Sequence, residues 1–211
     1  METPVILALE TSGAVGGITY FKGFPLLSVT VPSKESFCKN LFKIFKFFEK
    51  FEDFTLKDVD FFAVDVGPGS FTGLRIGVSV IKALGLVIPK PVVCVTSLEV
   101  LAYQNRTASK VAVIRNAYSG EVFFGLYRFE DSLPVAELSP LLVKATEVDG
   151  LIPRDAVVIK EETGLSPEAV ARLAFAYINR GFKDRIKSVD EVLPFYLKAS
   201  EAERKTGIKV S

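Results

Sequence analysis

Histidine is absent from the 211-residue sequence. The usual ligand of transition metals and the usual general base are therefore both missing. Catalysis by this chain alone would have to use carboxylates, lysine, tyrosine, serine or threonine. Tryptophan is also absent, and the two cysteines, Cys38 and Cys94, lie far apart in apolar stretches. We expect free buried thiols there, since nothing in the spacing indicates a disulfide or a metal pair.

A strong charge of either sign is also lacking, because 26 lysines and arginines oppose 25 acidic residues. Contact with RNA would therefore require a local basic patch or a partner's surface. No apolar run reaches the length of a membrane span, and Lys82 interrupts the longest candidate. The start, Met1 to Pro4, lacks the basic segment of a signal peptide. We expect a cytoplasmic protein with no membrane segment.

Apolar runs and turn residues predict an α/β fold in two parts, residues 1–108 and 109–211. In the first part the predicted strands are residues 5–10, 17–21, 25–32, 59–66 and 91–96, and the predicted helices are residues 33–54, 70–86 and 97–104. In the second part the predicted strands are residues 110–117, 120–129, 135–143 and 155–160, followed by a helix at residues 166–180 and an extended tail. The second part thus repeats the order of the first, a meander followed by a strand and a helix.

The predicted helix at residues 33–54, which Ser33 can cap, is unusually apolar. Its apolar side chains cover an arc of roughly 220°, whereas a helix on one sheet needs only about 100°. Two explanations remain open: the helix is enclosed within its own fold, or part of the arc contacts a partner protein. The candidate partner residues on this helix are Phe37, Leu41, Phe45 and Phe48.

The segment DVGPGSFTGLRIG, Asp65 to Gly77, joins a predicted strand to a predicted helix. It lacks the Gly-Lys-Ser/Thr of a Walker loop, and Thr72 stands where a dinucleotide fingerprint has its third glycine. A structural turn is the favoured interpretation. The alternative is an anion site at the backbone amides of Ser70, Phe71 and Thr72.

The helix after this loop has Gly73 and Gly77 on one face, which predicts unusually close packing there. Its flank is a second candidate partner surface, formed by Phe71, Leu74, Arg75, Val78 and Lys82.

Glu10 ends the first strand, just before the turn TSGAVGG. A carboxylate in this position is the first phosphate element of actin-like ATPases, in which it orients metal and water. The second part offers nothing comparable, because the segment VIRNAYSGEVF has no acid at the strand end. Such ATPases need both elements, so the sequence argues against autonomous ATP hydrolysis.

The segment GPGSFTGLRIG, Gly67 to Gly77, closely resembles the bacterial TsaB family, also called YeaZ. The opening ILALETS resembles the start of that family with Glu10 in place of aspartate. The closing VLPFYLKASEAE resembles its Pro-x-Tyr-Leu-Arg signature with Lys198 in place of arginine. The likeness covers most of the chain, although residues 33–40 and 115–123 depart from the family pattern.

The resemblance implies an actin-like ATPase (ASKHA) fold with two ribonuclease-H-like halves and mixed sheets. It implies a scaffold that pairs with the catalytic subunit TsaD, using its first two helices, and works with the TsaE ATPase. This machinery forms N6-threonylcarbamoyladenosine at position 37 of tRNAs that read codons starting with A, so contact with tRNA is indirect. The complex uses ATP and magnesium, but the chain alone is expected to bind no cofactor and no metal. An exposed apolar helix face also leads us to expect a homodimer when the partner is absent.

Two other function classes stay open. In the first, the chain is an autonomous ATPase or phosphotransferase, with Glu10 positioning Mg²⁺ and water while the amides of residues 70–72 hold phosphate. In the second, it is a peptidase, an activity once proposed for relatives, although no pair of nucleophile and base is visible.

Overall fold

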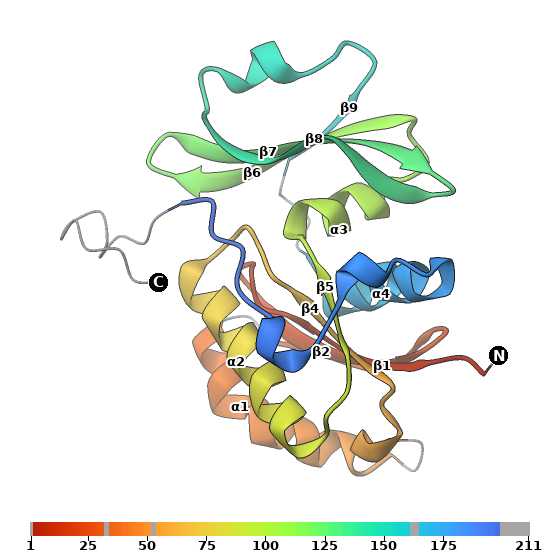
Figure 1. The fold of residues 1–211 in the computed structure, drawn as a ribbon. Helices are drawn as coiled ribbons and strands as arrows, with labels where there is room; N and C mark the ends of the chain where they lie inside the picture. Colours follow the sequence, from red (N-terminus) through yellow and green to blue (C-terminus); the bar gives the residue numbers. More distant parts are fainter. Residues whose placement is uncertain (1, 32–33, 52–53, 161–164, 199–211) are drawn as a thin grey trace.

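The computed structural model describes residues 2–31, 34–51, 54–160 and 165–198. Two β-sheets are stacked with two helices between them, and two further helices cover the far face of the first sheet (Figure 1). Strand β1, with Val5, Leu7 and Leu9 facing one side and Ile6 and Ala8 the other, is buried on both faces. An uninterrupted apolar strand is therefore what this central position requires.

The first sheet has the strand order β10-β5-β4-β1-β2-β3. Strands β1, β2 and β3 form an antiparallel meander, and β4 and β5 run parallel to β1, as the sequence predicted. The strands are β1 (Val5–Glu10), β2 (Gly16–Lys22), β3 (Pro25–Val31), β4 (Phe61–Asp65), β5 (Val92–Val95) and β10 (Ile186–Lys187). The short β10 pairs antiparallel with β5 and was not predicted.

The second sheet, in the order β8-β7-β6-β9, repeats the arrangement β3-β2-β1-β4 of the first. Its strands are β6 (Lys110–Tyr118), β7 (Glu121–Glu130), β8 (Leu133–Lys144) and β9 (Val157–Lys160). Strands β6, β7 and β8 are antiparallel, and β9 runs parallel to β6. The predicted structural repeat and the mixed sheets are therefore confirmed.

Helices α1 (Lys34–Phe48) and α2 (Phe71–Val87) pack against one face of the first sheet, and α3 (Ser97–Gln104) and α4 (Pro167–Arg180) lie between the sheets. Side-chain caps begin helices α3 and α4. The Thr96 hydroxyl accepts from the Glu99 amide in a capping box, and Ser166 caps α4, which ends at Gly181 with φ 73°. Four 3₁₀ turns complete the described elements: Leu56–Asp58, Val148–Leu151, Lys183–Arg185 and Val189–Glu191.

Helix α1 ends at Phe48, earlier than predicted. The amide of Phe51 donates to the Phe48 carbonyl and that of Phe54 to the Phe51 carbonyl, so the chain leaves the helix through tighter turns. Phe54 then packs edge-on against Phe48 and Tyr20, with ring centroids 5.2 and 5.0 Å apart. The predicted cap Ser33 and the side chain of Cys38 lie outside the described residues.

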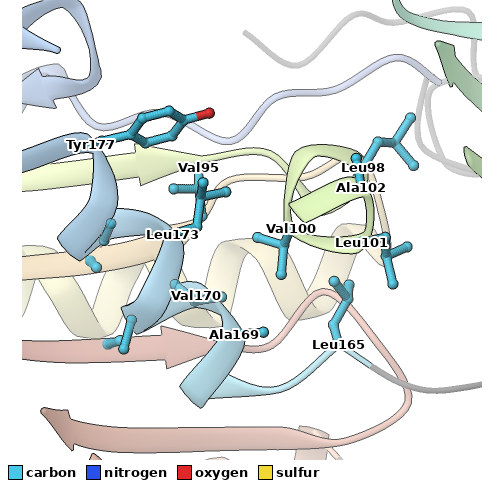
Figure 2. Close-up of a cluster of buried hydrophobic side chains, with 14 of the residues drawn as sticks. Val95, Leu98, Val100, Leu101, Ala102, Leu165, Ala169, Val170, Leu173 and Tyr177 are labelled. Carbon is cyan, nitrogen blue, oxygen red and sulfur yellow. The ribbon is translucent and has the colours of Figure 1, made fainter. Parts of the chain in front are cut away.

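One apolar core joins the two halves. Figure 2 shows its centre, where Val100 and Leu101 of α3 meet Leu165 and the α4 residues Val170 and Leu173. Valines of β6 and aromatic side chains of β7 reach the same cluster from the second sheet. Arg185, beyond α4, pairs with the buried Glu99 of α3. The helices between the sheets thus hold both halves through a continuous contact.

The predicted boundary between residues 1–108 and 109–211 separates the two sheets, but the end of the chain returns to the first half. Helix α4 packs against β1 and β2, and β10 extends the first sheet beyond β5. The segment that follows, residues 188–198, crosses α2 toward the second sheet (Figure 1). No helix in the described part of the chain is long and apolar enough for a bilayer crossing.

Candidate functional site

The carboxyl ends of β1, β4 and β5 meet at one edge of the first sheet. Glu10 ends β1, Asp65 ends β4 and Ser97 follows β5, and all three side chains are completely buried. Because these parallel strands are neighbours, their last residues must lie close together. The result is a buried polar cluster between the two halves, at the edge where open α/β sheets commonly bind ligands.

Glu10 holds the β1–β2 turn. Its Oε1 atom accepts hydrogen bonds from the backbone amides of Ser12 and Gly13, at 2.6 and 3.0 Å, and lies 2.8 Å from the Ser12 hydroxyl. Its other oxygen, Oε2, is buried without a hydrogen-bond partner in the described part of the chain. The carboxyl group therefore stabilises the β1–β2 turn through the hydrogen bonds of Oε1, while Oε2 is buried.

Asp65 holds the glycine loop and the start of α3. Its Oδ1 accepts from the Gly67 amide at 2.7 Å, and the Ser97 hydroxyl lies 2.6 Å from Oδ2. The Ser12 hydroxyl lies 2.8 Å from the same Oδ2 atom. Both serine hydroxyls are thus engaged with carboxyl groups inside the protein. They are 0–1% exposed, so neither is available as a peptidase nucleophile.

Arg115 enters this cluster from the second half. It lies on β6, directly after the apolar residues Val111 to Ile114, and is 3% exposed. Its Nη1 donates to the Ser12 hydroxyl at 2.9 Å and to the Pro68 carbonyl at 2.8 Å, while Nη2 donates to the Ser12 carbonyl at 2.8 Å. The guanidinium group therefore joins the β1–β2 turn to the glycine loop.

The pKa of the Glu10 carboxyl is raised well above its ordinary value of 4.5. Burial is the main cause, and the negative charge of Asp65 acts in the same direction, while Arg115 and the Ser12 hydrogen bonds oppose it. Because Oε1 already accepts hydrogen bonds, Oε2 is the natural position for the proton. Burial and Asp65 therefore both favour the neutral form of Glu10.

The glycine loop is shaped by close contact. A Cβ added at Gly69 would lie 2.8 Å from Arg115 Nη1 and from the Ser12 carbonyl oxygen. Gly67 has φ +112°, and a Cβ there would lie 2.8 Å from Leu74 Cδ1. The Ser70 amide donates to the Ser12 carbonyl at 3.0 Å, so it is not free for an anion.

Part of the predicted anion site is occupied by contacts within the chain. Arg115 fills the space between the turn and the glycine loop, and the amide of Ser70 is occupied within the protein. Phe71 is half-buried and stacks on Tyr196, with ring centroids 4.5 Å apart, and Thr72 is exposed in the first turn of α2. The structural-turn interpretation of the loop agrees with this geometry.

Comparison with known proteins identifies the family. Residues 33–178 match the family described as "TsaD: tRNA N6-adenosine threonylcarbamoyltransferase". The chain belongs to this family. TsaB, the tRNA threonylcarbamoyladenosine biosynthesis protein of Buchnera aphidicola (subspecies Schizaphis graminum), is 27% identical over 149 residues, which cover 69% of this chain and 71% of that protein.

The TsaB protein of Bacillus subtilis is 38% identical over 82 residues, covering 38% of this chain and 36% of the relative. A Pseudomonas aeruginosa structure described as similar to peptidase YeaZ is 24% identical, with a TM-score of 0.77 over 92% of this chain and all of that one. The predicted TsaB/YeaZ resemblance and the actin-like α/β fold are thereby confirmed.

Four of the predicted partner residues lie inside this TsaB-like fold. Phe37, Phe48, Leu74 and Val78 are 0–5% exposed and belong to the chain's own core. The side chains of these four residues are therefore not part of a free surface, and the burial of Phe37 and Phe48 agrees with the enclosed-helix explanation for α1. They were misassigned because helical periodicity cannot say which side of an apolar arc faces the sheet.

The other predicted partner residues are more accessible. Leu41 and Phe45 are half-buried on α1 and pack at the margin of the core. Arg75 is exposed beside the ring of Phe71, with its guanidinium carbon 4.1 Å from the ring centroid, and Lys82 Nζ lies 3.5 Å from the Asp190 carbonyl. A partner surface on α1 and α2 stays a prediction.

Sequence reasoning missed Ser12, Asp65, Ser97 and Arg115. A signal for the first three was present, because polar residues directly after three apolar, parallel strands must meet at one edge of a sheet. Arg115 carried a different signal, a charge directly after the apolar run Val111 to Ile114. The acceptors that Arg115 reaches depend on how the second sheet is placed over the first, and a local sequence pattern does not encode this placement.

Proposed function

We propose that this chain is a non-catalytic scaffold subunit in the formation of N6-threonylcarbamoyladenosine at position 37 of tRNAs that read codons starting with A. It pairs with a TsaD-like catalytic subunit. A TsaE-like ATPase joins the same assembly, and tRNA is contacted through the partner. Without its partner the chain forms a homodimer.

The observation that carries this proposal is the presence of exposed aromatic side chains on α1 and on the turn after it. Phe42, Phe47 and Phe51 are 80, 46 and 41% exposed. Phe47 and Ile44 also line a groove of about 290 Å³ with Val29 and Lys43. Large exposed aromatic side chains grouped on one helix are typical of a protein interface.

Two further observations support a role without catalysis. The sequence has no histidine, so it lacks the usual metal ligand and general base. The buried cluster of Glu10, Asp65 and Arg115 is occupied by contacts within the chain. We therefore assign ATP and magnesium to the other members of the assembly and not to this chain.

The test is co-purification with the TsaD-like protein of the same organism, followed by measurement of the dissociation constant. Phe42→Asp and Phe47→Asp should each weaken binding at least tenfold, or about 1.4 kcal/mol, because they place a charge in a desolvated contact. Leu151→Asp is the matched control, since Leu151 is 38% exposed on the second half. Full binding by both phenylalanine variants would refute this placement of the interface.

An autonomous ATPase or phosphotransferase is the second candidate. The purified chain should show no ATP hydrolysis that depends on Glu10, as measured by phosphate release with Glu10→Gln alongside. Turnover that disappears in this variant would favour the enzyme. Light scattering of the pure chain tests the homodimer, which Phe42→Asp should dissociate if the same face is used.

A further inference from the structure

The guanidinium group of Arg115 on the second sheet makes polar contacts with the β1–β2 turn of the first half. We propose that Arg115 is an internal latch, which holds the two halves of the chain in one closed arrangement without any ligand. In two-domain folds that close on a ligand, the ligand itself supplies contacts to both sides. Here a side chain of the protein supplies them.

Three hydrogen bonds of Arg115 run from the second half to the first. The acceptors are the Ser12 carbonyl at 2.8 Å, the Ser12 hydroxyl at 2.9 Å and the Pro68 carbonyl at 2.8 Å. Side-chain alternation along β6 accounts for the direction, since Val111 and Val113 face the shared core between the halves and Arg115 continues that face. The acceptors are backbone and hydroxyl oxygens that a bound anion could not bridge.

The first half is shaped to receive this group. Gly69 has no side chain at the point where a Cβ would lie 2.8 Å from Arg115 Nη1. Ser12 presents its carbonyl both to Arg115 and to the amide of Ser70, so the latch, the turn and the loop share one atom. A buried charged donor with several oxygen acceptors is geometrically specific, and removing it takes a hydrogen bond away from each of them, including the Pro68 carbonyl.

A second contact keeps the halves together if the latch is removed. Lys198 Nζ donates to the carbonyls of Ala117 and Tyr118, at 2.7 and 2.9 Å, and lies 2.8 Å from Glu121. The same C-terminal segment is tied to the first half by the Phe195 amide, which donates to the Val66 carbonyl at 2.7 Å. Loss of Arg115 should therefore loosen the junction locally and leave the chain folded.

The latch has a consequence that rests on the proposed function. The loop that Arg115 holds leads directly into α2, whose exposed flank carries Arg75. Holding the loop fixes the start of α2 and presents that flank in a single conformation. A scaffold would gain from this, because a partner surface that is already ordered loses less entropy on binding.

Hydrogen exchange of the full chain tests the latch. In Arg115→Ala, the amides of Ser70 and Ser97, which donate to the Ser12 and Gly67 carbonyls, should exchange at least tenfold faster, while amides of β1 and β7 keep their protection. Arg115→Lys should give a smaller increase at the same sites, since it keeps the charge but loses the planar fork. Arg128→Ala is the matched control, an arginine on the neighbouring strand β7 that pairs with Glu130 on the surface.

Unchanged exchange at Ser70 and Ser97 in Arg115→Ala would overturn the proposal, as would a uniform increase across both sheets, which would mean a global loss of stability. If Arg115→Ala does not fold, the Arg115→Lys variant provides the test. Exchange rates equal to those of the wild type would overturn the latch, and faster exchange confined to the junction amides would support it. Addition of Mg²⁺ with ATP should leave amide exchange of the wild type unchanged. Increased protection of the junction amides by this ligand would overturn the proposal of a ligand-independent latch. Failure of the wild type to bind a TsaD-like protein would refute the proposed function and leave the latch intact.

Discussion

Replacement of Glu10 by glutamine tests whether this carboxyl is a neutral structural group. The amide oxygen of glutamine can accept the hydrogen bonds that Oε1 receives from the amides of Ser12 and Gly13. The amide nitrogen would take the place of Oε2, which has no partner in the described part of the chain, and would face the charge of Asp65 as a donor. The variant therefore imitates the protonated form of Glu10 at every pH.

The raised pKa of Glu10 sets the sign of the pH dependence. Above pH 4.5 the unfolded chain releases this proton, whereas the folded chain keeps it until its own, higher pKa is reached. In that interval the folded state binds more protons, so the contribution of Glu10 to stability falls as pH rises. The slope is at most about 1.4 kcal/mol per pH unit, because one proton is involved.

Guanidinium denaturation of wild type and Glu10→Gln from about pH 5 to about pH 8 measures this contribution. The two should be similar at the acid end, and the variant should become relatively more stable at each higher pH. Glu147→Gln, a change at an exposed carboxylate beside Lys144, should leave the slope of the wild type unaltered. Parallel curves, or a variant that is less stable throughout, would show that the folded chain needs an ionised Glu10.

Two further substitutions test local packing by the same measurement. Gly77→Ala should lower the free energy of unfolding by about 1–2 kcal/mol, because its Cβ would collide with Thr11 Oγ1 and overpacking outweighs the gain in helix propensity. The control is Gly150→Ala, which should be near neutral because a Cβ at Gly150 has nothing within 4 Å. Equal effects of the two substitutions would contradict the close-packing explanation. Thr96→Ala should cost about 1 kcal/mol through loss of the capping box at α3, while the exposed Thr72→Ala should cost much less; a neutral Thr96→Ala would mean that packing alone holds the helix.

The order of elements could be predicted because the local signals agree. Apolar strands, the glycine loop and the caps of α3 and α4 are all encoded within short segments. Gly77 is an example, since the sequence indicated close packing and the structure identifies Thr11 as the neighbour. Thr11 also donates to the Gly73 carbonyl at 2.7 Å, which fixes the start of α2 on the β1–β2 turn.

The missed features depend on how distant segments lie in space. The two residues of β10 form a strand only because the chain returns to the free edge of β5 after α4. Arg115 reaches Ser12, 103 positions away, through the arrangement of the two sheets. The assignment of Phe37 and Phe48 to a partner surface was wrong for a related reason, because the apolar arc of α1 is wide and the sequence does not say which part of it the sheet covers.

A comparison between the two halves offers an explanation for the exposure of Phe42. The sheets share one strand order, but between the third and fourth strands the first half has helix α1, and the second has a 3₁₀ turn, Val148–Leu151. The outer face of the second sheet is covered by a small cluster that includes Val148, so a full helix is not required to close such a sheet. Helix α1 therefore provides more apolar surface than its own sheet needs, and Phe42, at 80% exposure, lies on the excess. Exposed aromatic surface is unfavourable in water. Burial of the exposed aromatic side chains of α1 by a partner would explain why only the first half has a helix at this position.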